Sequence, residues 1–345
     1  MRVGALPGVE GEFELLSRLL GKSEGAAKLV RPASYIPHMS NPFFLHCRDA
    51  VLDCRPGAAP HVMGILNVTP DSFSDGGQYT DVDAALRRAE VMLGEGARII
   101  DIGGESTRPK GSVYGEGATA LPADEEKRRV VPVIEAVTAR FPEAIVSIDT
   151  YKGEVAKAAV EAGAAIINDV TGLRYDAEAP VPTGRVAAEA GVPVVVMHSL
   201  GRPGEMPHER SYGDVVADVQ ASLAKSVQRA EDAGVKGIVV DPGFGFGKSA
   251  EENLRLLAGI PVLLELGRPV LVGISRKSTI GAVLGTPGQP APVQERLHGS
   301  LGATAVAVMA GASIVRTHDV RATADFLRVL HATRRLSPAH TEEPA

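Results

Sequence analysis

The sequence predicts a protein of the α/β class, a (βα)₈ or TIM barrel, on two observations. Short apolar segments rich in β-branched residues recur between residues 62 and 317, and a segment with helical spacing of apolar residues follows each of them. The apolar segments lack polar alternation, as expected of parallel strands that are buried on both faces. Eight strand–helix units match the count of a closed barrel. An open, doubly wound sheet is the alternative.

The elements are predicted in the following order. The strands cover residues 62–68, 98–102, 144–149, 165–168, 193–198, 237–241, 269–275 and 313–317. The first helix begins after Asp81, whose side chain suits an N-cap. The later helices cover residues 124–140, 152–162, 184–190, 214–233, 250–257, 293–310 and 322–335.

Two short extended runs, 43–46 and 51–54, precede the barrel and predict a hairpin within residues 41–60 that plugs its bottom. Residues 41–335 are then one barrel domain that includes the hairpin. Residues 1–40 form a short N-terminal extension of unknown role. The polar tail, 336–345, is predicted to be disordered.

Composition excludes several classes of protein. The chain of 345 residues has a formal net charge of −6, 4% aromatic residues and no Trp, which argues against general nucleic-acid binding. No apolar run approaches the ~20 residues of a membrane span, and the N-terminus lacks a signal-peptide pattern. Cys47 and Cys54 are expected to be free thiols in a reducing compartment, with a local disulfide as the alternative. We therefore expect a cytoplasmic protein without membrane or nucleic-acid partners.

The polar chemistry follows the strands, and in such barrels the loops at the carboxyl ends of the strands form the active site. The first strand ends at Asn67, and side-chain oxygens and two glycines crowd residues 69–77. The second strand leads into Gly103-Gly104, which lets backbone approach a ligand, and then into Thr107 and Arg108, which donate to anions. Ordinary capped turns are the alternative.

Carboxylates also end the third and fourth strands, at Asp149 and at Asn168-Asp169. A carboxylate at the end of an apolar strand is costly to bury unless it binds something. Helix capping by Asp149 or Asp169 is the alternative.

The last three strand ends complete an anion site, and the seventh strand leads into Ser275-Arg276-Lys277-Ser278. Alternating glycines and phenylalanines follow Asp241 and predict a backbone cradle with an aromatic wall, because the spacing of a phosphate loop is not met. Arg316 and His318, two residues apart at the end of the eighth strand, point the same way if extended. Together with Arg108 they predict a cationic pocket for a diphosphate, at a place where barrels often bind phosphate.

In order and position these motifs resemble the dihydropteroate synthase family. The matching segments are 63–77, 101–109, 147–150, 167–170, 197–198, 241–248, 275–278 and 316–318, and the resemblance covers about residues 43 to 333. It implies a transferase of folate biosynthesis that joins 6-hydroxymethyl-7,8-dihydropterin diphosphate to 4-aminobenzoate, giving 7,8-dihydropteroate and diphosphate. It also implies an SN1-like substitution with Mg²⁺, a homodimer and inhibition by sulfonamides.

The resemblance further implies residue roles. The pterin would be held by Asp149, Asn168, Met197, Asp241 and Lys277. The diphosphate would be bound by Asn67, Thr107, Arg108, Arg316 and His318, with Mg²⁺ between Asn67 and the phosphates. The aminobenzoate pocket would be lined by Pro109, Phe246, Ser275 and Lys277 and ordered by Asp71 and Phe73. The catalytic set would be Asp149, Lys277, Arg108 and Asp71.

One departure from the family pattern is Lys110, where Gly is usual. Two other functions share part of the pattern. A pterin-binding methyltransfer barrel would need no diphosphate site, so the cations around Lys277 and Arg316 argue against it. A degenerate relative would bind pterins without turnover.

Overall fold

The computed structural model describes residues 41–68, 78–105, 121–202, 212–286 and 288–336, without the side chains of residues 78–81. The predicted N-terminal extension and the tail beyond residue 336 lie outside these ranges. Within the described ranges, no helix is long and apolar enough to cross a membrane.

Eight parallel strands form the predicted barrel, in the order β8-β7-β6-β5-β4-β3-β10-β9. A parallel bridge between Val240 and Val270 joins the two ends of this order and closes the ring. The strands are β3 (His61–Asn67), β4 (Ile99–Gly103), β5 (Ile145–Asp149), β6 (Ile166–Asp169), β7 (Val194–Met197), β8 (Ile238–Asp241), β9 (Leu271–Val272) and β10 (Ile314–Thr317). The barrel prediction is confirmed and the open sheet is not adopted.

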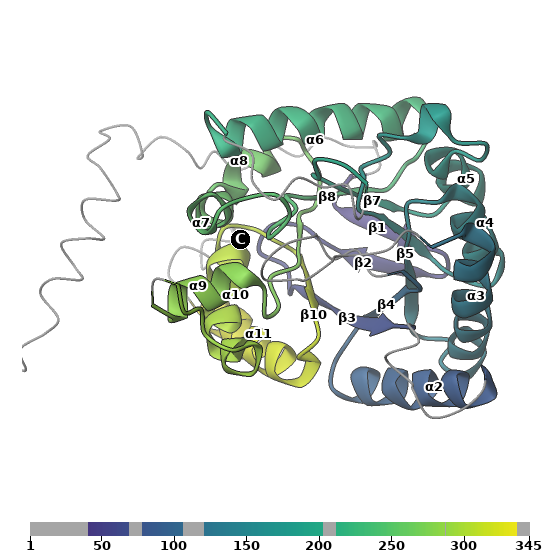
Figure 1. Cartoon of the computed structure of the whole chain (residues 1–345), viewed down its shortest axis with the longest axis horizontal. Coiled ribbons are helices and arrows are strands. Elements are labelled where there is room, and N and C mark those ends of the chain that lie inside the picture. Colours follow the sequence, from purple (N-terminus) through teal and green to yellow (C-terminus); the bar gives the residue numbers. More distant parts are fainter. Residues whose placement is uncertain (1–40, 69–77, 106–120, 203–211, 287, 337–345) are drawn as a thin grey trace, which may run out of the picture. The chain divides into compact units, whose positions relative to one another are not determined.

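Helices surround the strands (Figure 1). They are α2 (Gln78–Gly94), α3 (Ala123–Arg140), α4 (Gly153–Glu161), α5 (Thr183–Ala190), α6 (Val215–Asp232), α7 (Ala250–Ala258), α8 (Ile260–Leu264), α9 (Ser278–Leu284), α10 (Leu297–Met309) and α11 (Val320–Arg335), with short 3₁₀ turns at Asp176–Glu178 and Val293–Arg296. Helix α2 begins at Gln78, so the predicted N-cap at Asp81 is wrong. Helices α8 and α9 were not predicted, because their short, Gly- or Pro-containing segments show little helical periodicity.

Side chains alternate along each strand between the helix layer and the barrel interior. In β5, Val146 and Ile148 pack in the helix-facing core, whereas Ile145 belongs to a separate core at the other end of the barrel from the polar strand ends. The remaining members of the interior row, Ser147 and Asp149, are polar and buried. The strands thus give the barrel an apolar floor and a polar mouth.

The predicted hairpin is present as β1 (Phe44–Cys47) and β2 (Ala50–Asp53), paired antiparallel. Leu45 and Leu52 are fully buried and pack on interior residues of the barrel strands, so the hairpin plugs the apolar end. Both cysteines are free thiols. Cys47 pairs with Ala50 next to the turn of the hairpin. The backbone N–H of Cys54 donates to the carbonyl of Phe43 at the open end, so the two thiols lie at opposite ends of the hairpin.

Candidate active site

The centre of the polar mouth is an ion-pair cluster that spans four strands. Arg316 of β10 donates from Nε to Asp101 Oδ2 of β4 at 2.6 Å and from Nη2 to Asp149 Oδ2 of β5 at 2.7 Å. Asn168 of β6 donates from Nδ2 to Asp101 Oδ2 at 3.2 Å. The second oxygens of Asp101 and Asp149 are buried and have no hydrogen-bond partner among the described residues. These two acceptors, beside an amide, suit a planar ligand edge that carries several N–H donors.

Burial sets the protonation of this cluster. It raises the pKa of Asp149 to about 7, with the nearby Asp101 carboxylate adding to the rise and the Arg316 guanidinium opposing it. Burial lowers the pKa of Arg316, but the Asp101 and Asp149 carboxylates outweigh burial and raise the pKa overall, so the guanidinium stays charged. The mouth therefore keeps a permanent cation next to a carboxyl that titrates near neutrality.

The opposite wall of the mouth is built from the β8–α7 and β9–α9 loops. Asp241 is buried and accepts from the backbone N–H of Gly243 at 2.7 Å. Lys277 donates to the carbonyl of Phe244, and its Nζ lies 4.4 Å from the centre of the Phe246 ring. The glycine-rich backbone and the Phe246 ring thus lie against Lys277 as the predicted cradle and wall would, and ligand binding there stays a prediction.

A glycine is required in that cradle. Gly245 has φ of +82°, and a Cβ added there would lie 2.6 Å from Cδ of Lys277.

Burial lowers the pKa of Lys277 to about 8, with Asp241 acting in the opposite direction. Burial also raises the pKa of Asp241, against the effect of Lys277.

The loop after β9 also meets the end of β10. Nδ1 of His318 lies 3.2 Å from Oγ of Ser275, which also accepts from the His318 backbone N–H at 3.3 Å. Between Ser275 and Lys277, Arg276 adopts φ of +55°, and its guanidinium pairs with Asp319. The structure thus brings Ser275, Lys277, Arg316 and His318 to one side of the mouth, as the sequence predicted.

Asp149 and Asp169 point to opposite sides of their strands and therefore have different roles. Asp169 points away from the mouth and takes the N–H groups of Thr171 and Leu173, at 2.7 Å and 3.1 Å. It therefore caps the turn that follows β6 and not a helix, so its role is structural although the helix-capping alternative is wrong for Asp169. The capping alternative is wrong for Asp149, whose described partner is Arg316.

The other predicted site residues are placed as follows. A Cβ added at Gly103 would lie 3.7 Å from Asn67 Oδ1 and 3.8 Å from Asp149 Oδ2, so Asn67 stands beside the cluster. Met197 is buried in β7, next to Asp241 in the strand register. The predicted residues Asp71, Phe73, Thr107, Arg108 and Pro109, and the departure Lys110, lie outside the described residues.

Sequence reasoning missed Asp101. It is fully buried and holds both Arg316 and Asn168. The signal was available, because Asp101 precedes Gly103 by two positions in a strand and so faces the same side.

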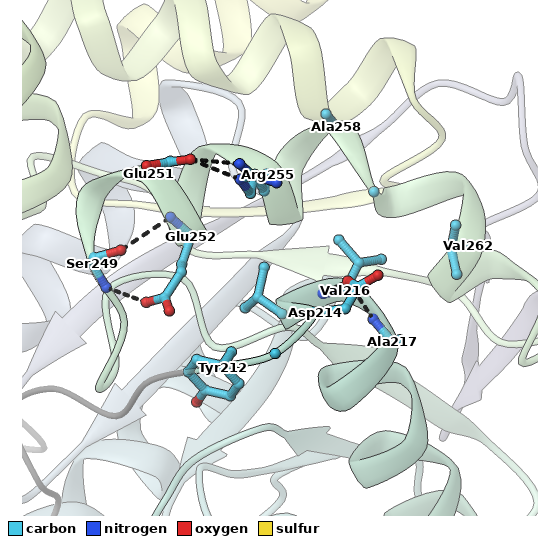
Figure 2. Close-up of a pocket in the computed structure, with 13 residues that line it drawn as sticks. Tyr212, Asp214, Val216, Ala217, Ser249, Glu251, Glu252, Arg255, Ala258 and Val262 are labelled. Carbon is cyan, nitrogen blue, oxygen red and sulfur yellow. Dashed lines mark hydrogen bonds and ion pairs between the residues drawn. The ribbon is translucent and has the colours of Figure 1, made fainter. Parts of the chain in front are cut away.

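A separate pocket of about 780 Å³ lies outside this mouth, between the first turns of α6 and α7 (Figure 2). Five of its polar side chains are already engaged in local bonds. Asp214 caps α6, Ser249 and Glu252 form a capping box on α7, and Glu251 pairs with Arg255. None of the predicted site residues lines it.

Comparison with known proteins shows the family of the chain. The family model described as "Pterin binding enzyme" matches residues 63–318. A dihydropteroate synthase of Escherichia coli K12 is 44% identical over 276 residues, which are 79% of this chain and 92% of that protein.

Solved structures give the same result. A Xanthomonas albilineans dihydropteroate synthase with 4-aminobenzoic acid is 44% identical and superposes with a TM-score of 0.74, covering 86% of this chain and all (100%) of that one. The enzyme from the same organism in complex with 7,8-dihydropteroate is 41% identical, with a TM-score of 0.70, covering 85% of this chain and 100% of that one. The chain therefore belongs to the dihydropteroate synthase family of pterin-binding enzymes.

Proposed function

We propose that this protein is a dihydropteroate synthase, which joins 6-hydroxymethyl-7,8-dihydropterin diphosphate to 4-aminobenzoate and releases diphosphate. The observation that carries the proposal is the buried Asp101–Arg316–Asp149 cluster, which offers unpartnered carboxylate oxygens at the mouth of a pterin-binding barrel. The N–H groups of a pterin edge fit those oxygens, and the ring acceptors fit Asn168 and Lys277. Met197 supplies an apolar surface for the ring.

The chemistry that this mouth favours is a substitution in which bond breaking leads. The bond between the pterin methylene carbon and the diphosphate oxygen breaks, and the electron pair leaves with the diphosphate. The amine of 4-aminobenzoate then forms a C–N bond to the methylene carbon and loses a proton. Asp149 stabilises the positive charge that develops on the pterin. His318, together with Thr107 and Arg108 from the segment outside the described residues, would stabilise the negative charge on the departing group. The Arg316 guanidinium, which is paired with Asp101 and Asp149, adds positive charge beside it.

Mg²⁺ fits this site only as an ion shared with the substrate. No group of three or more His, Cys, Asp or Glu side chains that could hold a metal occurs among the described residues. The amide oxygen of Asn67 beside the cluster would hold Mg²⁺ together with phosphate oxygens and water, since this ion takes oxygen ligands, keeps several waters and is often shared with substrate phosphates. When bound, the ion would neutralise charge on the diphosphate.

The direct test is turnover. Purified protein with both substrates and Mg²⁺ is expected to form 7,8-dihydropteroate and diphosphate in equal amounts, and EDTA is expected to stop the reaction until Mg²⁺ is restored. Pterin binding in calorimetry without product would support a degenerate binding protein instead. Methyl transfer from a methylated folate to a corrinoid partner would support the methyltransfer alternative.

Sulfonamides are expected to inhibit competitively against 4-aminobenzoate. They resemble that substrate, so they would occupy the pocket that we assign to Phe246, Ser275 and Pro109. Initial rates at several concentrations of each substrate provide the measurement. Competition with the pterin diphosphate would contradict the assignment of this pocket.

The pH dependence of kcat/KM is expected to be a narrow bell with its maximum between pH 7 and pH 8. Below about pH 7 the Asp149 carboxylate takes up a proton and loses an acceptor, and above about pH 8 Lys277 loses its charge. An arginine at this position stays charged above pH 8. In the activity that Lys277→Arg retains, the alkaline fall in kcat/KM should therefore shift to higher pH. A flat profile from pH 6 to pH 9 would show that neither group governs the free enzyme.

We further propose a homodimer formed through α10. The exposed side of this helix carries His298, Gly302, Val306 and Met309, and Val306 and Met309 are 50% and 65% exposed. A Cβ at Gly302 would meet nothing within 4 Å, so the fold of one chain does not require a glycine there. A glycine costs about 1 kcal/mol in a helix, and an apolar face around it suits close approach of a second helix.

Val306→Glu is therefore expected to convert the dimer to a monomer, because it places a charge in an apolar contact. Light scattering of the purified protein at micromolar concentration provides the measurement. Val51→Glu is the matched control, since Val51 is 51% exposed on the hairpin. A wild-type protein that is monomeric at these concentrations would contradict the proposal.

We place the reaction in the cytoplasm. The two buried cysteines are free thiols, and burial raises the pKa of Cys47 and of Cys54 to about 12. Unreactive buried thiols are consistent with a reducing compartment.

A further inference from the structure

Two loops of the proposed site come from different strands and must be held in register. The loop after β8 carries Phe246 and the carbonyl that accepts from Lys277, and the loop after β9 carries Ser275 and Lys277 itself. The separation of these loops fixes where the Lys277 ammonium stands relative to Asp241 and to the Phe246 ring. A lysine side chain is too flexible to fix that separation alone.

Asn253 of α7 links the two loops. It is 1% exposed. Its Oδ1 accepts from the backbone N–H of Gly245 at 2.7 Å, and its Nδ2 donates to Oγ1 of Thr279 at 2.9 Å. Nδ2 also lies 2.9 Å from the carbonyl oxygen of Ser249 and 3.1 Å from that of Lys248. Thr279 is buried in the first turn of α9, two positions after Lys277.

Asn253 affects the position of Lys277 through Gly245. Gly245 packs against the aliphatic stem of Lys277, so a shift of Gly245 moves that stem. Inside the same loop, Lys248 is buried and donates to the carbonyls of Gly243 and Phe246, at 2.9 Å and 3.0 Å. The loop is therefore rigid in itself, and Asn253 sets its position against α9.

We infer that Asn253 is a positioning residue which, through Gly245 and Thr279, holds Lys277 at Phe246 and thereby sets the affinity for 4-aminobenzoate. The inference rests on the proposed function for the identity of that substrate. Removing the Thr279 hydroxyl breaks the bond between Asn253 and α9. Nδ2 then keeps its bonds to the carbonyls of Lys248 and Ser249 in its own segment, so Asn253 no longer fixes the position of the β8–α7 loop against α9. Among the described residues, the hydrogen bonds of Asp101 and Asp149 run to Arg316 and Asn168 and not to this link.

Thr279→Val tests the link while leaving the β8–α7 loop and Asn253 intact. We expect the KM for 4-aminobenzoate to rise at least tenfold and the KM for the pterin diphosphate, which Asp149 and Asn168 also hold, to rise by a smaller factor. Thr279→Ser, which keeps the hydroxyl, should stay within threefold of wild type for both. A general loss of structure would move both constants together. Thr304→Val is the matched control, because the partner of the buried Thr304 hydroxyl within the described part of the chain is the Ser300 carbonyl of its own helix.

A double-mutant cycle separates the link from two independent effects. If Asn253 and Thr279 act through one bond, Asn253→Ala with Thr279→Val should be no worse than Asn253→Ala alone. Losses that multiply, or a Thr279→Val enzyme within twofold of wild type, would overturn the inference. If Asn253→Ala fails to fold, the Thr279→Val result decides by itself.

Amide hydrogen exchange tests the link without any activity. The Gly245 amide should exchange faster in Asn253→Ala than in wild type. Its exchange rate should be unchanged in Thr304→Val. An unaltered Gly245 amide in a folded Asn253→Ala protein would refute the link even if the enzyme is active. Faster exchange in a protein that makes no dihydropteroate would retain the link and reject only the proposed function.

Discussion

Replacing Asp149 by asparagine is expected to lower kcat/KM at least a thousandfold, a loss of about 4 kcal/mol in transition-state stabilisation. The carboxylate is buried, held by Arg316, and has one oxygen without a partner among the described residues. An asparagine would direct an N–H₂ group toward a pterin edge that also donates, and it would remove the charge that stabilises the developing cation. Steady-state rates with both substrates provide the measurement.

The same substitution is not expected to weaken the fold. Burial raises the pKa of Asp149 to about 7, above its ordinary value of about 3.9, so the native protein holds this proton more tightly than the unfolded chain. The contribution of this group to stability is complete below about pH 4 and is lost as pH rises through 7. At pH 8 the ionised group therefore costs stability, and asparagine removes that cost while Arg316 keeps Asp101 as its partner.

Asp169→Asn is the matched control, because it changes the same atoms at the end of the neighbouring strand. Asp169 accepts three hydrogen bonds from Thr171 and Leu173, so this variant is expected to lose stability and to keep kcat/KM per folded molecule within about threefold. If Asp149→Asn kept most of its activity, or if Asp169→Asn lost activity equally while folded, the assignment of Asp149 to the pterin would be wrong.

Replacing Lys277 by methionine is expected to lower kcat/KM at least a hundredfold, or about 3 kcal/mol. Methionine keeps the unbranched stem that packs on Gly245 and removes only the ammonium, which donates to Phe244 and lies over Phe246. Lys277→Ala removes both stem and charge and is expected to lose at least as much. Both variants are compared by kcat/KM for each substrate, with melting temperatures measured alongside.

The comparison of these two variants separates charge from packing. Burial lowers the pKa of Lys277 to about 8, below its ordinary value of about 10.4, so the native protein holds this proton less tightly than the unfolded chain. At pH 7 the charged group costs stability, and that cost disappears as pH rises from 8 to above 10. Lys277→Met should therefore be as stable as wild type. Near-normal turnover in Lys277→Met would show that the ammonium is not required.

The strand ends could be predicted from the sequence, because buried strands are rich in apolar residues and alternate side chains point to the same side of the strand. Mostly apolar strands with Asp149, Asn168 or Asp241 at or next to their last residue indicate one face of a barrel mouth. The hairpin was equally visible as two short runs. Strand β9 was predicted over 269–275 but spans Leu271–Val272, because Gly273 and the left-handed Arg276 turn the chain away from the sheet.

Other features depended on contacts between distant parts of the chain. Arg316 was expected at the diphosphate, yet its described partners are Asp101 and Asp149, which lie 215 and 167 positions away in the sequence. Asp149 and Asp169 look alike in the sequence, and only their opposite orientations separate a site carboxylate from a turn cap. The partners of Asn253 likewise could not be read from spacing.

The sequence by itself determined the barrel, its polar mouth and the family, because strand periodicity and local motifs depend on neighbouring residues along the chain. Only the tertiary structure decided which carboxylates share Arg316, which protons are held near neutral pH and which residue joins the two loops around Lys277. These properties arise from burial and from partners on other strands. Desolvation and ion pairing act through distances in space, and those distances exist only once the barrel has closed.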